Sequence, residues 1–382
     1  MVPISGPVPV ERPWYGLIGL ESIASPALLL YGERIEKNLA EMIRIAGGPQ
    51  RLRPHVKTHK LPQLIQRQME LGIVRFKAAT LMECSMAAQA GAGDILLAYP
   101  PVGPSVQEWV ELVQSFPGTR FSCLADDIGT LKALSAAAIA RNLSLEVLID
   151  LDVGLHRTGL PPGNDAERLY SELIALPGLL PGGLHAYDGH ITNQNPDERA
   201  ARCDEAFVPV SALRSALTSR GWAVPRLVVG GSPTFPIHVR RGDVELSPGT
   251  TVLWDAGYAQ KFPDLPFLPA AVLLTRVISK PSPDRLCLDL GHKAVASEMP
   301  HPRVEFLNLP GASPILHSEE HLVVECPDAH RWNVGDAVYA IPRHICPTVA
   351  LHEQVTVVDS GEVTERWTVT ARNRWWKDSQ DR

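Results

Sequence analysis

The chain has 382 residues, enough for about two domains of ordinary size. Hydrophobic residues make up 45% and charged residues 20%, a balance that indicates a folded globular protein and excludes an intrinsically disordered one. The 36 Lys and Arg against 42 Asp and Glu give a net charge of −6, so there is no excess positive charge for nucleic acid or an anionic membrane.

The expected location is the cytoplasm. No apolar run reaches the roughly 18 residues of a membrane span. The segment Met1–Pro13 holds proline and charge instead of the apolar core of a signal peptide. Six scattered cysteines without C-x-x-C spacing indicate free thiols.

From about residue 27 to residue 260, short apolar runs alternate with longer stretches that have apolar residues at helical spacing. About eight repeats of strand and helix are typical of a parallel sheet, and several runs lack alternation, as in strands buried on both faces. We therefore expect an α/β fold with a (β/α)8 barrel. An open doubly wound sheet is the alternative, but no G-x-G-x-x-G follows a first strand. The runs expected as strands are Pro26–Tyr31, Val74–Ala79, Ile95–Tyr99, Phe121–Leu124, Leu145–Leu151, Gly183–Tyr187 and Leu227–Val229.

After about Asp264 the pattern changes to short β-branched segments separated by closely spaced turn residues, which predicts an antiparallel β domain. The expected division is an N-terminal segment at 1–32 that packs with the β domain, the barrel at 33–262 and the β domain at 263–382. The β segments are Ala270–Ser279, Arg285–Leu290, His321–Cys326, Asp336–Ile341, Gln354–Val358 and Glu362–Ala371.

The strongest local signal is the segment Arg53–Lys60, with the sequence RPHVKTHK. Leu52–Val56 is expected as a short strand, which places the basic residues at its carboxyl end, where barrel enzymes carry out catalysis. An ammonium such as that of Lys57, beside other cations and partly desolvated, has a lowered pKa and becomes a nucleophilic amine. A solvated basic loop is the alternative, and it is the commoner one when these residues are considered alone.

Further polar residues follow other apolar runs. Arg157, on a loop with glycines, is either an anion binder or a surface salt-bridge partner. Tyr187 and His190 follow a later run, where packing is a commoner role than acid–base catalysis. Two segments near the last barrel strands combine glycines with hydroxyls and suit an anion such as phosphate, although most such segments are simply turns. Their residues are Gly230, Gly231, Ser232, Thr234, Gly249 and Thr250.

Near the C-terminus, His344 and Cys346 are two residues apart on a segment expected to be extended, so their side chains should lie on the same side. Imidazole and thiolate together suit zinc, although most isolated H-x-C pairs are packed side chains. The segment His317–His321 matches the H-x-x-E-H pattern of some metalloproteases. That chemistry needs both histidines on one helical face, whereas the flanking residues predict strands.

Taken in order over about residues 25–375, these segments resemble the D-threonine aldolase and D-serine dehydratase family, which uses pyridoxal 5′-phosphate (PLP) and has the alanine racemase barrel. The resemblance implies that Lys57 is the Schiff-base lysine and that Arg157 reaches the phenolic oxygen of the cofactor or the substrate. It also places Tyr187 near the pyridine ring, His190 as a candidate base at the substrate hydroxyl, and the glycine and hydroxyl segments at the phosphate.

The resemblance further implies that His344 and Cys346 bind a divalent metal. Cys346 favours zinc, with manganese, magnesium or cobalt as the other options. Aldolases of the family carry Asp and D-serine dehydratases carry Cys at this position, whereas the following Pro347–Val349 resembles the aldolases. The Glu-Glu-His part of His317–His321 recurs among the aldolases, where it lines the domain junction.

The implied activity is that of a lyase acting on a D-3-hydroxy amino acid. A D-threonine aldolase, which forms glycine and an aldehyde, is slightly favoured over a D-serine or D-threo-3-hydroxyaspartate dehydratase. An amino-acid racemase, with Tyr339 as a second acid–base residue, and a non-catalytic PLP carrier are further alternatives. A homodimer with active sites at the junction of barrel and β domain is expected from the family.

Overall fold

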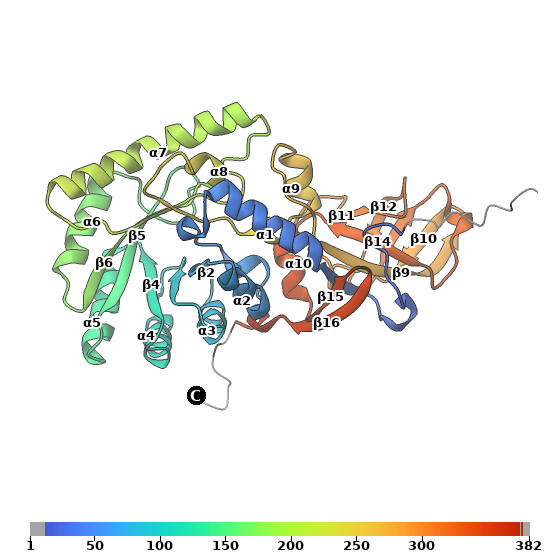
Figure 1. The fold of residues 1–382 in the computed structure, drawn as a ribbon, viewed down its shortest axis with the longest axis horizontal. Coiled ribbons are helices and arrows are strands. Elements are labelled where there is room, and N and C mark those ends of the chain that lie inside the picture. Colours follow the sequence, from blue (N-terminus) through green and yellow to red (C-terminus); the bar gives the residue numbers. More distant parts are fainter. Residues whose placement is uncertain (1–11, 375, 377–382) are drawn as a thin grey trace, which may run out of the picture.

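The structure is a computed structural model that describes residues 12–374 and 376. It contains a seven-stranded parallel sheet and a nine-stranded mixed sheet, which lie at opposite ends of an elongated molecule (Figure 1). Residues 1–11 of the expected N-terminal segment, and residues 375 and 377–382 of the expected β domain, lie outside the described residues. No helix in the described part of the chain has the length and apolar character needed to cross a membrane.

The parallel sheet follows the chain order, each strand pairing with the next. Most of its residues are apolar and buried, because helices cover the outer side and the barrel interior is packed. Its strands are β2 (Arg75–Ala78), β3 (Asp94–Leu97), β4 (Arg120–Ala125), β5 (Leu145–Leu151), β6 (Leu179–Ala186), β7 (Leu227–Val229) and β8 (Glu245–Leu246).

The segment 52–55 closes this sheet into a barrel. Leu52 forms a parallel bridge to Leu246 of β8, and His55 forms one to Lys77 of β2. The amide of Arg53 donates to the carbonyl of Leu246, and the amide of Lys77 donates to the carbonyl of Pro54. The sequence predicts a strand at Leu52–Val56, but the segment forms only two isolated bridges. A continuous ladder is interrupted because Pro54 has no amide to donate.

Helices surround the barrel strands (Figure 1). Several begin at a side-chain cap: Thr80, Asp127 and Asn195 accept hydrogen bonds from first-turn amides of α3, α5 and α7. The helices up to the end of the barrel are α1 (Gly32–Ala46), α2 (Pro62–Glu70), α3 (Leu81–Gln89), α4 (Ser105–Ser115), α5 (Ile128–Ala140), α6 (Asn164–Ala175), α7 (Pro196–Ser219), α8 (Phe235–His238) and α9 (Ala256–Lys261).

The second sheet has the order β12-β13-β10-β9-β1-β15-β16, with β14 also paired to β9 and β11 paired to β14. All its pairs are antiparallel except β1 with β15. Helix α10 (Ile345–Leu351) lies between this sheet and the barrel (Figure 1). The strands are β1 (Ala27–Tyr31), β9 (Ala271–Ser282), β10 (Arg285–Leu288), β11 (Val304–Phe306), β12 (Ser313–His317), β13 (Leu322–Glu325), β14 (Ala337–Pro342), β15 (Gln354–Asp359) and β16 (Glu362–Thr368).

The apolar run Pro26–Tyr31 is a strand, but it is wrong as a member of the alternating barrel pattern. It forms β1, whose neighbours are β9 and β15 of the second sheet. Periodicity within a run reports burial and not the identity of the neighbouring strand. The position of β1 in the second sheet agrees with the separate expectation that the segment 1–32 packs with the β domain. The eighth position in the barrel is taken by residues 52–55.

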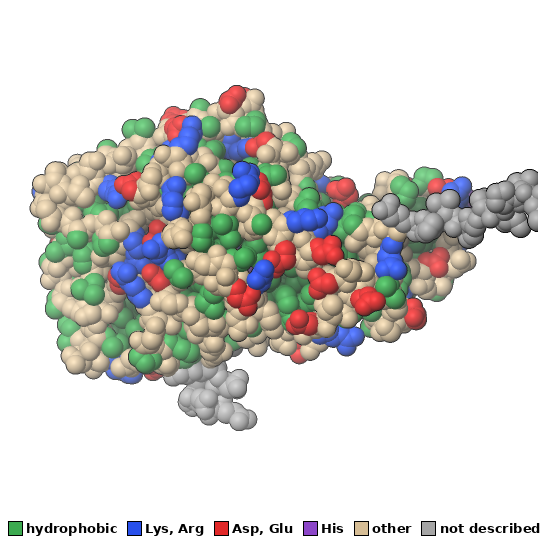
Figure 2. Space-filling view, viewed as in Figure 1, with side chains coloured by type: hydrophobic (Ala, Val, Ile, Leu, Met, Phe, Trp, Pro, Cys, Tyr) green, Lys and Arg blue, Asp and Glu red, His purple; other side chains and the backbone are tan. Residues whose placement is uncertain are grey.

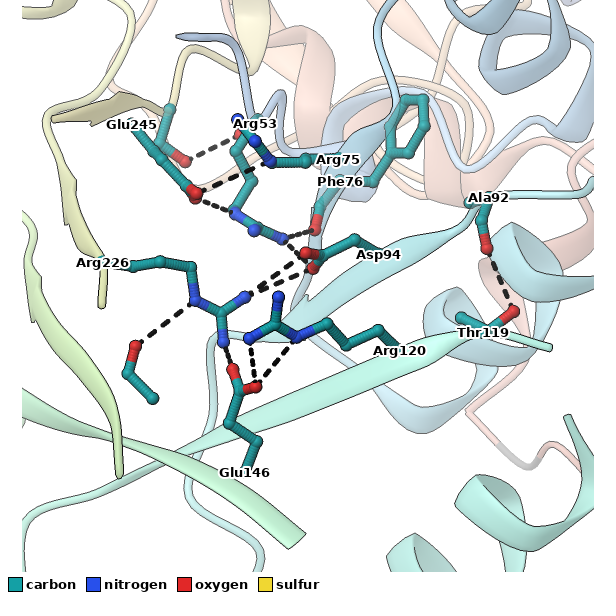
Figure 3. Close-up of polar contacts among 12 residues, drawn as sticks. Arg53, Arg75, Phe76, Ala92, Asp94, Thr119, Arg120, Glu146, Arg226 and Glu245 are labelled. Carbon is teal, nitrogen blue, oxygen red and sulfur yellow. Dashed lines mark hydrogen bonds and ion pairs between the residues drawn. The ribbon is translucent and has the colours of Figure 1, made fainter. Parts of the chain in front are cut away.

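Charged side chains are paired at the end of the barrel where the strands begin (Figure 3). The guanidinium of Arg53, which is 0% exposed, contacts Glu245 at 2.6 Å and Asp94 at 2.8 Å. Arg226 contacts Asp94 and Glu146, and Arg120 also contacts Glu146. In this network each arginine lies beside at least one carboxylate, so the charges at the end of the barrel where the strands begin are paired. On the outer face in Figure 2, basic and acidic side chains are interspersed.

We expect Arg53→Met to lower the free energy of unfolding by about 3–5 kcal/mol, because it leaves the carboxylates of Asp94 and Glu245 buried without their partner. The measurement is urea denaturation followed by circular dichroism. Arg67→Ala is the control, since its pairs with Glu36 and Glu70 are exposed, and it should cost less than about 1 kcal/mol. Equal effects of the two substitutions would contradict the role of the buried network.

The effect of Arg53→Met should also depend on pH. Burial alone would raise the pKa of Asp94, but Arg53 and Arg226 lower it below the ordinary value of 3.8. A lowered folded-state pKa contributes stability above the ordinary pKa and loses it as the pH falls through the folded value. The difference between wild type and variant should therefore shrink below about pH 4. A constant difference from pH 7 to pH 3 would contradict this assignment.

Candidate active site

A cavity opens at the carboxyl ends of the barrel strands, where α10 meets the barrel. Its lining includes two lysines, an arginine and two histidines and, within the described residues, no carboxylate. Such a lining fits an anionic group with several charges, as a phosphorylated cofactor is. The lining residues are His55, Lys57, Thr58, Lys77, Ala98, Arg157, His185, Tyr187, Gly231, Ser232, Ser247, Gly249, Thr250, Tyr258 and Cys346.

Lys57 lies on the short 3-10 turn Val56–Thr58 that follows the bridge at His55. Its backbone amide donates to Nδ1 of His55 at 3.3 Å, which fixes the turn. No ion pair to the Lys57 amine is found among the described residues, so the amine is available to a ligand. The sequence expectation that Lys57 follows the carboxyl end of a barrel segment agrees with this position.

A second lysine, Lys77 of β2, lies in the same cavity and is 2% exposed. Burial and the nearby Lys57 ammonium lower the pKa of Lys77 to about 7. Burial, Lys57 and Lys77 also hold the pKa of His55 well below its ordinary value, so this imidazole is neutral. The cavity therefore contains one amine, that of Lys77, that can be uncharged near neutral pH, the state in which an amine is nucleophilic or accepts a proton.

A negative charge, the carboxylate of Asp150, lies behind the residues that line the cavity. Nδ1 of His185 on β6 contacts Oδ1 of Asp150 on β5 at 2.7 Å, and both side chains are buried. Burial alone would raise the pKa of Asp150, but His185, Thr158 and Arg157 lower it. The carboxylate thus stays ionised and orients the imidazole, whose other nitrogen is left for the cavity.

Tyr187, directly after β6, forms one wall. Its ring is held between two glycines: a Cβ at Gly189 would lie 2.4 Å from its Cε1, and a Cβ at Gly231 would lie 3.0 Å from its Cε2. The guanidinium carbon of Arg157 is 5.2 Å and Nζ of Lys77 is 5.6 Å from the ring centroid. The wall is therefore an aromatic surface with fixed orientation and two cations over its ring.

Arg157 is presented by the loop after β5. The carboxylate of Asp152 accepts hydrogen bonds from the amides of Gly154 and His156 and so shapes this loop. Gly159 ends it with φ of +94°, and a Cβ there would lie 2.6 Å from the amide nitrogen of Asp152. Only glycine fits at this close approach.

The two glycine and hydroxyl segments meet at Ser232. Its Oγ accepts hydrogen bonds from the amides of Gly249 and Thr250, at 3.1 and 2.9 Å. A Cβ at Gly249 would lie 3.1 Å from Cβ of His55. The loops after β7 and β8 are thus tied together on one side of the cavity, at the place where barrels bind phosphate.

His344 and Cys346 lie at the start of α10. Burial alone would lower the pKa of His344, but the hydrogen bonds with Cys346 and Glu298 raise it to about 9. Burial alone would raise the pKa of the Cys346 thiol, but His344 and Lys57 lower it. The pair is an imidazole beside a sulfur with thiolate character, a donor set that fits a zinc ion.

The expectation that His344 and Cys346 lie on an extended segment is wrong. His344 has extended backbone angles, but it is the N-cap of α10 and Cys346 is inside the helix. The carboxylate of Asp255 accepts the amide of Ile345 at 3.0 Å and fixes this helix start. The two side chains still interact with each other, because a helix start also places nearby residues together.

Eight of the expected site residues line the cavity: Lys57, Arg157, Tyr187, Gly231, Ser232, Gly249, Thr250 and Cys346. His344 lines an adjoining hollow that shares Tyr258 with the cavity. Gly230 and Thr234 lie behind the lining, where Oγ1 of Thr234 donates to Asp188 and accepts from the amide of Gly231. His190 is exposed, lies over Gly154 and does not line the cavity.

Sequence reasoning missed Lys77, His55 and His185 as cavity residues. The signal for Lys77 was present, since it is a charged residue in the middle of a run expected to be buried on both faces. His185 has the same position in the run Gly183–Tyr187. A charge or imidazole in such a strand needs a partner or a cavity.

The H-x-x-E-H segment is not a metalloprotease site. Its histidines flank a turn between β12 and β13, as the strand expectation predicted, and the amide of Ser318 donates to the carbonyl of His321. His317 contacts Arg303 and the carbonyl of Leu290. Glu319 and Glu320 pair with Lys293 at the surface.

Comparisons with known proteins agree with this geometry. Residues 32–253 match the alanine racemase N-terminal domain family, and residues 270–358 match the putative serine dehydratase domain. The chain is 30% identical to a D-threonine aldolase from Arthrobacter sp. over 92% of its own length and 94% of the relative. It is 27% identical to a 3-hydroxy-D-aspartate aldolase from Paracoccus denitrificans over 92% and 93% of the two chains.

Two solved structures have the same fold. The crystal structure of D-threonine aldolase from Filomicrobium marinum matches with a TM-score of 0.86 and 30% identity over 94% of this chain and 98% of that one. The D-threo-3-hydroxyaspartate dehydratase from Delftia sp. HT23 matches with a TM-score of 0.81 over 94% and 99%, at 22% identity.

These matches define the class of the protein as a PLP-dependent lyase with an alanine racemase-like fold. The chain belongs to the alanine racemase N-terminal domain family, in the branch that contains the D-threonine aldolases. The family resemblance and the fold class expected from the sequence are confirmed. The family also implies PLP and a metal, for which the cavity has a fitting charge and donor set.

We expect Gly189→Ala to weaken PLP binding by about 5- to 150-fold, because overpacking costs about 1–3 kcal/mol and the added Cβ would push the Tyr187 ring out of its place. The measurement is fluorescence titration of cofactor-free protein with PLP. Gly118→Ala is the control, since a Cβ there meets nothing within 4 Å. Unchanged affinity in Gly189→Ala would show that the Tyr187 wall does not contact the cofactor.

Proposed function

We propose that this protein is a PLP- and divalent-metal-dependent D-threonine aldolase that cleaves D-3-hydroxy amino acids to glycine and an aldehyde. The observation that carries the proposal is the convergence of Lys57 and Cys346 in one cavity whose lining has no carboxylate among the described residues. The 30% identity to a D-threonine aldolase over 92% of the chain supports the aldolase, compared with 26% over 62% for a D-threo-3-hydroxyaspartate dehydratase.

Lys57 would hold PLP covalently, and the loops joined by Ser232 would surround its phosphate. The cofactor supplies an electron sink for negative charge at the substrate Cα. Tyr187 would form a fixed wall for the cofactor, and the Arg157 guanidinium over its ring would donate to an anionic oxygen of cofactor or substrate. Lys77, with a pKa of about 7, holds or releases a proton at its Nζ inside the cavity.

His344 and Cys346 would hold the metal, and the thiolate character of Cys346 favours zinc. Such an ion supplies a Lewis acid that makes the substrate β-hydroxyl more acidic. Glu298 contacts Nδ1 of His344 and orients the ring. The assignment of His190 as base at the hydroxyl remains a prediction, and the geometry gives more support to groups that line the cavity or its adjoining hollow.

A D-serine or D-threo-3-hydroxyaspartate dehydratase is the second candidate. The sulfur ligand at Cys346, instead of a carboxylate, favours it, and both reactions need the same cavity. A racemase has less support, because Tyr339 is 5% exposed and packs against Tyr15, with ring centroids 5.2 Å apart, away from the cavity lining.

We also propose a homodimer in the cytoplasm. The dimer rests on the family to which the chain belongs. The cytoplasmic location rests on six unpaired cysteines, which suit a reducing compartment. Light scattering of the purified protein tests the dimer, and a monomer would contradict it.

The lysine assignment is tested by borohydride reduction of the cofactor-loaded protein followed by peptide mass spectrometry. We expect the pyridoxyl group on Lys57, and we expect Lys57→Ala to lose the visible absorption band of bound PLP. Lys60→Ala should keep the band, because its ammonium pairs with Glu83 outside the cavity. A pyridoxyl group on Lys77 or Lys60 would show that Lys57 is the wrong lysine.

The reaction is tested by incubating the enzyme with D-threonine and D-serine and identifying the products. Aldehyde and glycine are expected, whereas a 2-oxo acid would indicate the dehydratase and an L-enantiomer the racemase. No turnover with either amino acid would contradict all three enzymes. A chelator should abolish turnover while PLP stays bound, and zinc should restore it; turnover that ignores the chelator would remove His344 and Cys346 from the reaction.

A further inference from the structure

Behind the wall formed by Tyr187, three side chains with metal-binding atoms meet. Asp188 follows β6, Cys203 lies on α7 and His238 ends α8, and they are 4%, 1% and 3% exposed. Nε2 of His238 lies 2.8 Å from Oδ2 of Asp188 and 3.2 Å from Sγ of Cys203, and that sulfur lies 3.7 Å from the same carboxylate oxygen. None of the three is needed for the activity proposed above.

The distances between the three atoms fit a common ion. A triangle with these sides has a circumscribed radius of about 1.9 Å, so a point about 1 Å above its plane lies about 2.1–2.2 Å from all three atoms. Zinc bonds measure about 2.0–2.1 Å to imidazole nitrogen, 2.0–2.2 Å to carboxylate oxygen and 2.3 Å to thiolate sulfur. Shifts of a few tenths of an ångström would complete three of four tetrahedral positions.

The surroundings of the three side chains favour a buried ion. Oγ1 of Thr234 donates to Oδ1 of Asp188 at 2.7 Å, which leaves Oδ2 for the ion and orients the carboxylate. Nδ1 of His238 has no hydrogen-bond partner among the described residues, so the ring is held only through Nε2, the atom that faces the other two. A carboxylate and a thiolate balance the charge of a divalent ion, and this neutrality suits a buried position.

The three side chains are also joined by hydrogen bonds, in which Nε2 of His238 contacts Oδ2 of Asp188 at 2.8 Å and the thiol of Cys203 donates to the same oxygen at 3.7 Å. The second of these bonds is long, and Nδ1 of His238 has no partner among the described residues. An ion in the centre would bond to all three atoms at once.

We propose that Asp188, Cys203 and His238 form a second, structural metal site for zinc. On binding, the sulfur–hydrogen bond of Cys203 is replaced by a sulfur–zinc bond and the proton leaves to water, with no change of oxidation state. Through Thr234, which accepts the amide of Gly231, the site fixes the glycine loop next to the cavity. The site does not depend on PLP or on the reaction proposed above.

The test uses the full chain with His344→Ala and Cys346→Ala, which removes the other pair and leaves this cluster intact. After exhaustive chelation, the variant is titrated with Co²⁺ alone, which reports sulfur ligation by a thiolate-to-metal absorption band. We expect one cobalt per chain, a tetrahedral visible spectrum and its displacement by one equivalent of zinc. The absence of the sulfur band in this folded variant would overturn the proposal, whatever the result of the activity tests.

Further substitutions in the same background assign the band. Cys203→Ser should remove it, whereas Cys326→Ser should keep it, because Cys326 is an equally buried cysteine of the second sheet region. Asp188→Asn, which keeps the shape of the side chain, should weaken cobalt binding at least tenfold. A band that survives Cys203→Ser would place the ion elsewhere, and circular dichroism of each variant confirms that it is folded.

Discussion

The site depends on positive charge gathered in one cavity. Lys57, Lys77 and Arg157 line it, with no carboxylate among the described lining residues, and the buried ammonium of Lys77 would be unfavourable without compensation. Compensation comes from Asp150 and Asp188, which lie behind the lining and raise the pKa of Lys77 against the effect of burial. The cavity therefore stays attractive to an anion, and Lys77, with a pKa of about 7, can lose its proton near neutral pH.

The two ends of the barrel differ in whether their cations are paired with carboxylates. Where the strands begin, each buried arginine faces a carboxylate, and Arg53 contacts two of them (Figure 3). Where the strands end, no carboxylate of the described residues forms an ion pair with Lys57, Lys77 or Arg157, so these cations can bind a ligand. The second sheet contributes to this end through α10, which brings Cys346 within 3.2 Å of Oγ1 of Thr58 beside Lys57. A barrel alone would lack this sulfur.

The sequence was sufficient for the elements whose burial is visible locally. β5 and β7 have the predicted bounds. The two-residue β8 and the bridges at residues 52–55 are too short to show periodicity, and the pairing of β1 depends on distant strands. Site residues at strand ends were found from their position, whereas Lys77 was missed because its role depends on which neighbours surround it.

The central claim is that the cavity and its adjoining hollow unite a cofactor-bearing amine at Lys57 with a metal at His344 and Cys346. A crystal structure of the enzyme loaded with PLP and zinc, with anomalous data at the zinc edge, tests it most directly. The account predicts electron density continuous from Nζ of Lys57 to the cofactor and an anomalous peak within bonding distance of Nε2 of His344 and Sγ of Cys346. Cofactor density on another lysine, or no peak at this pair, would contradict it.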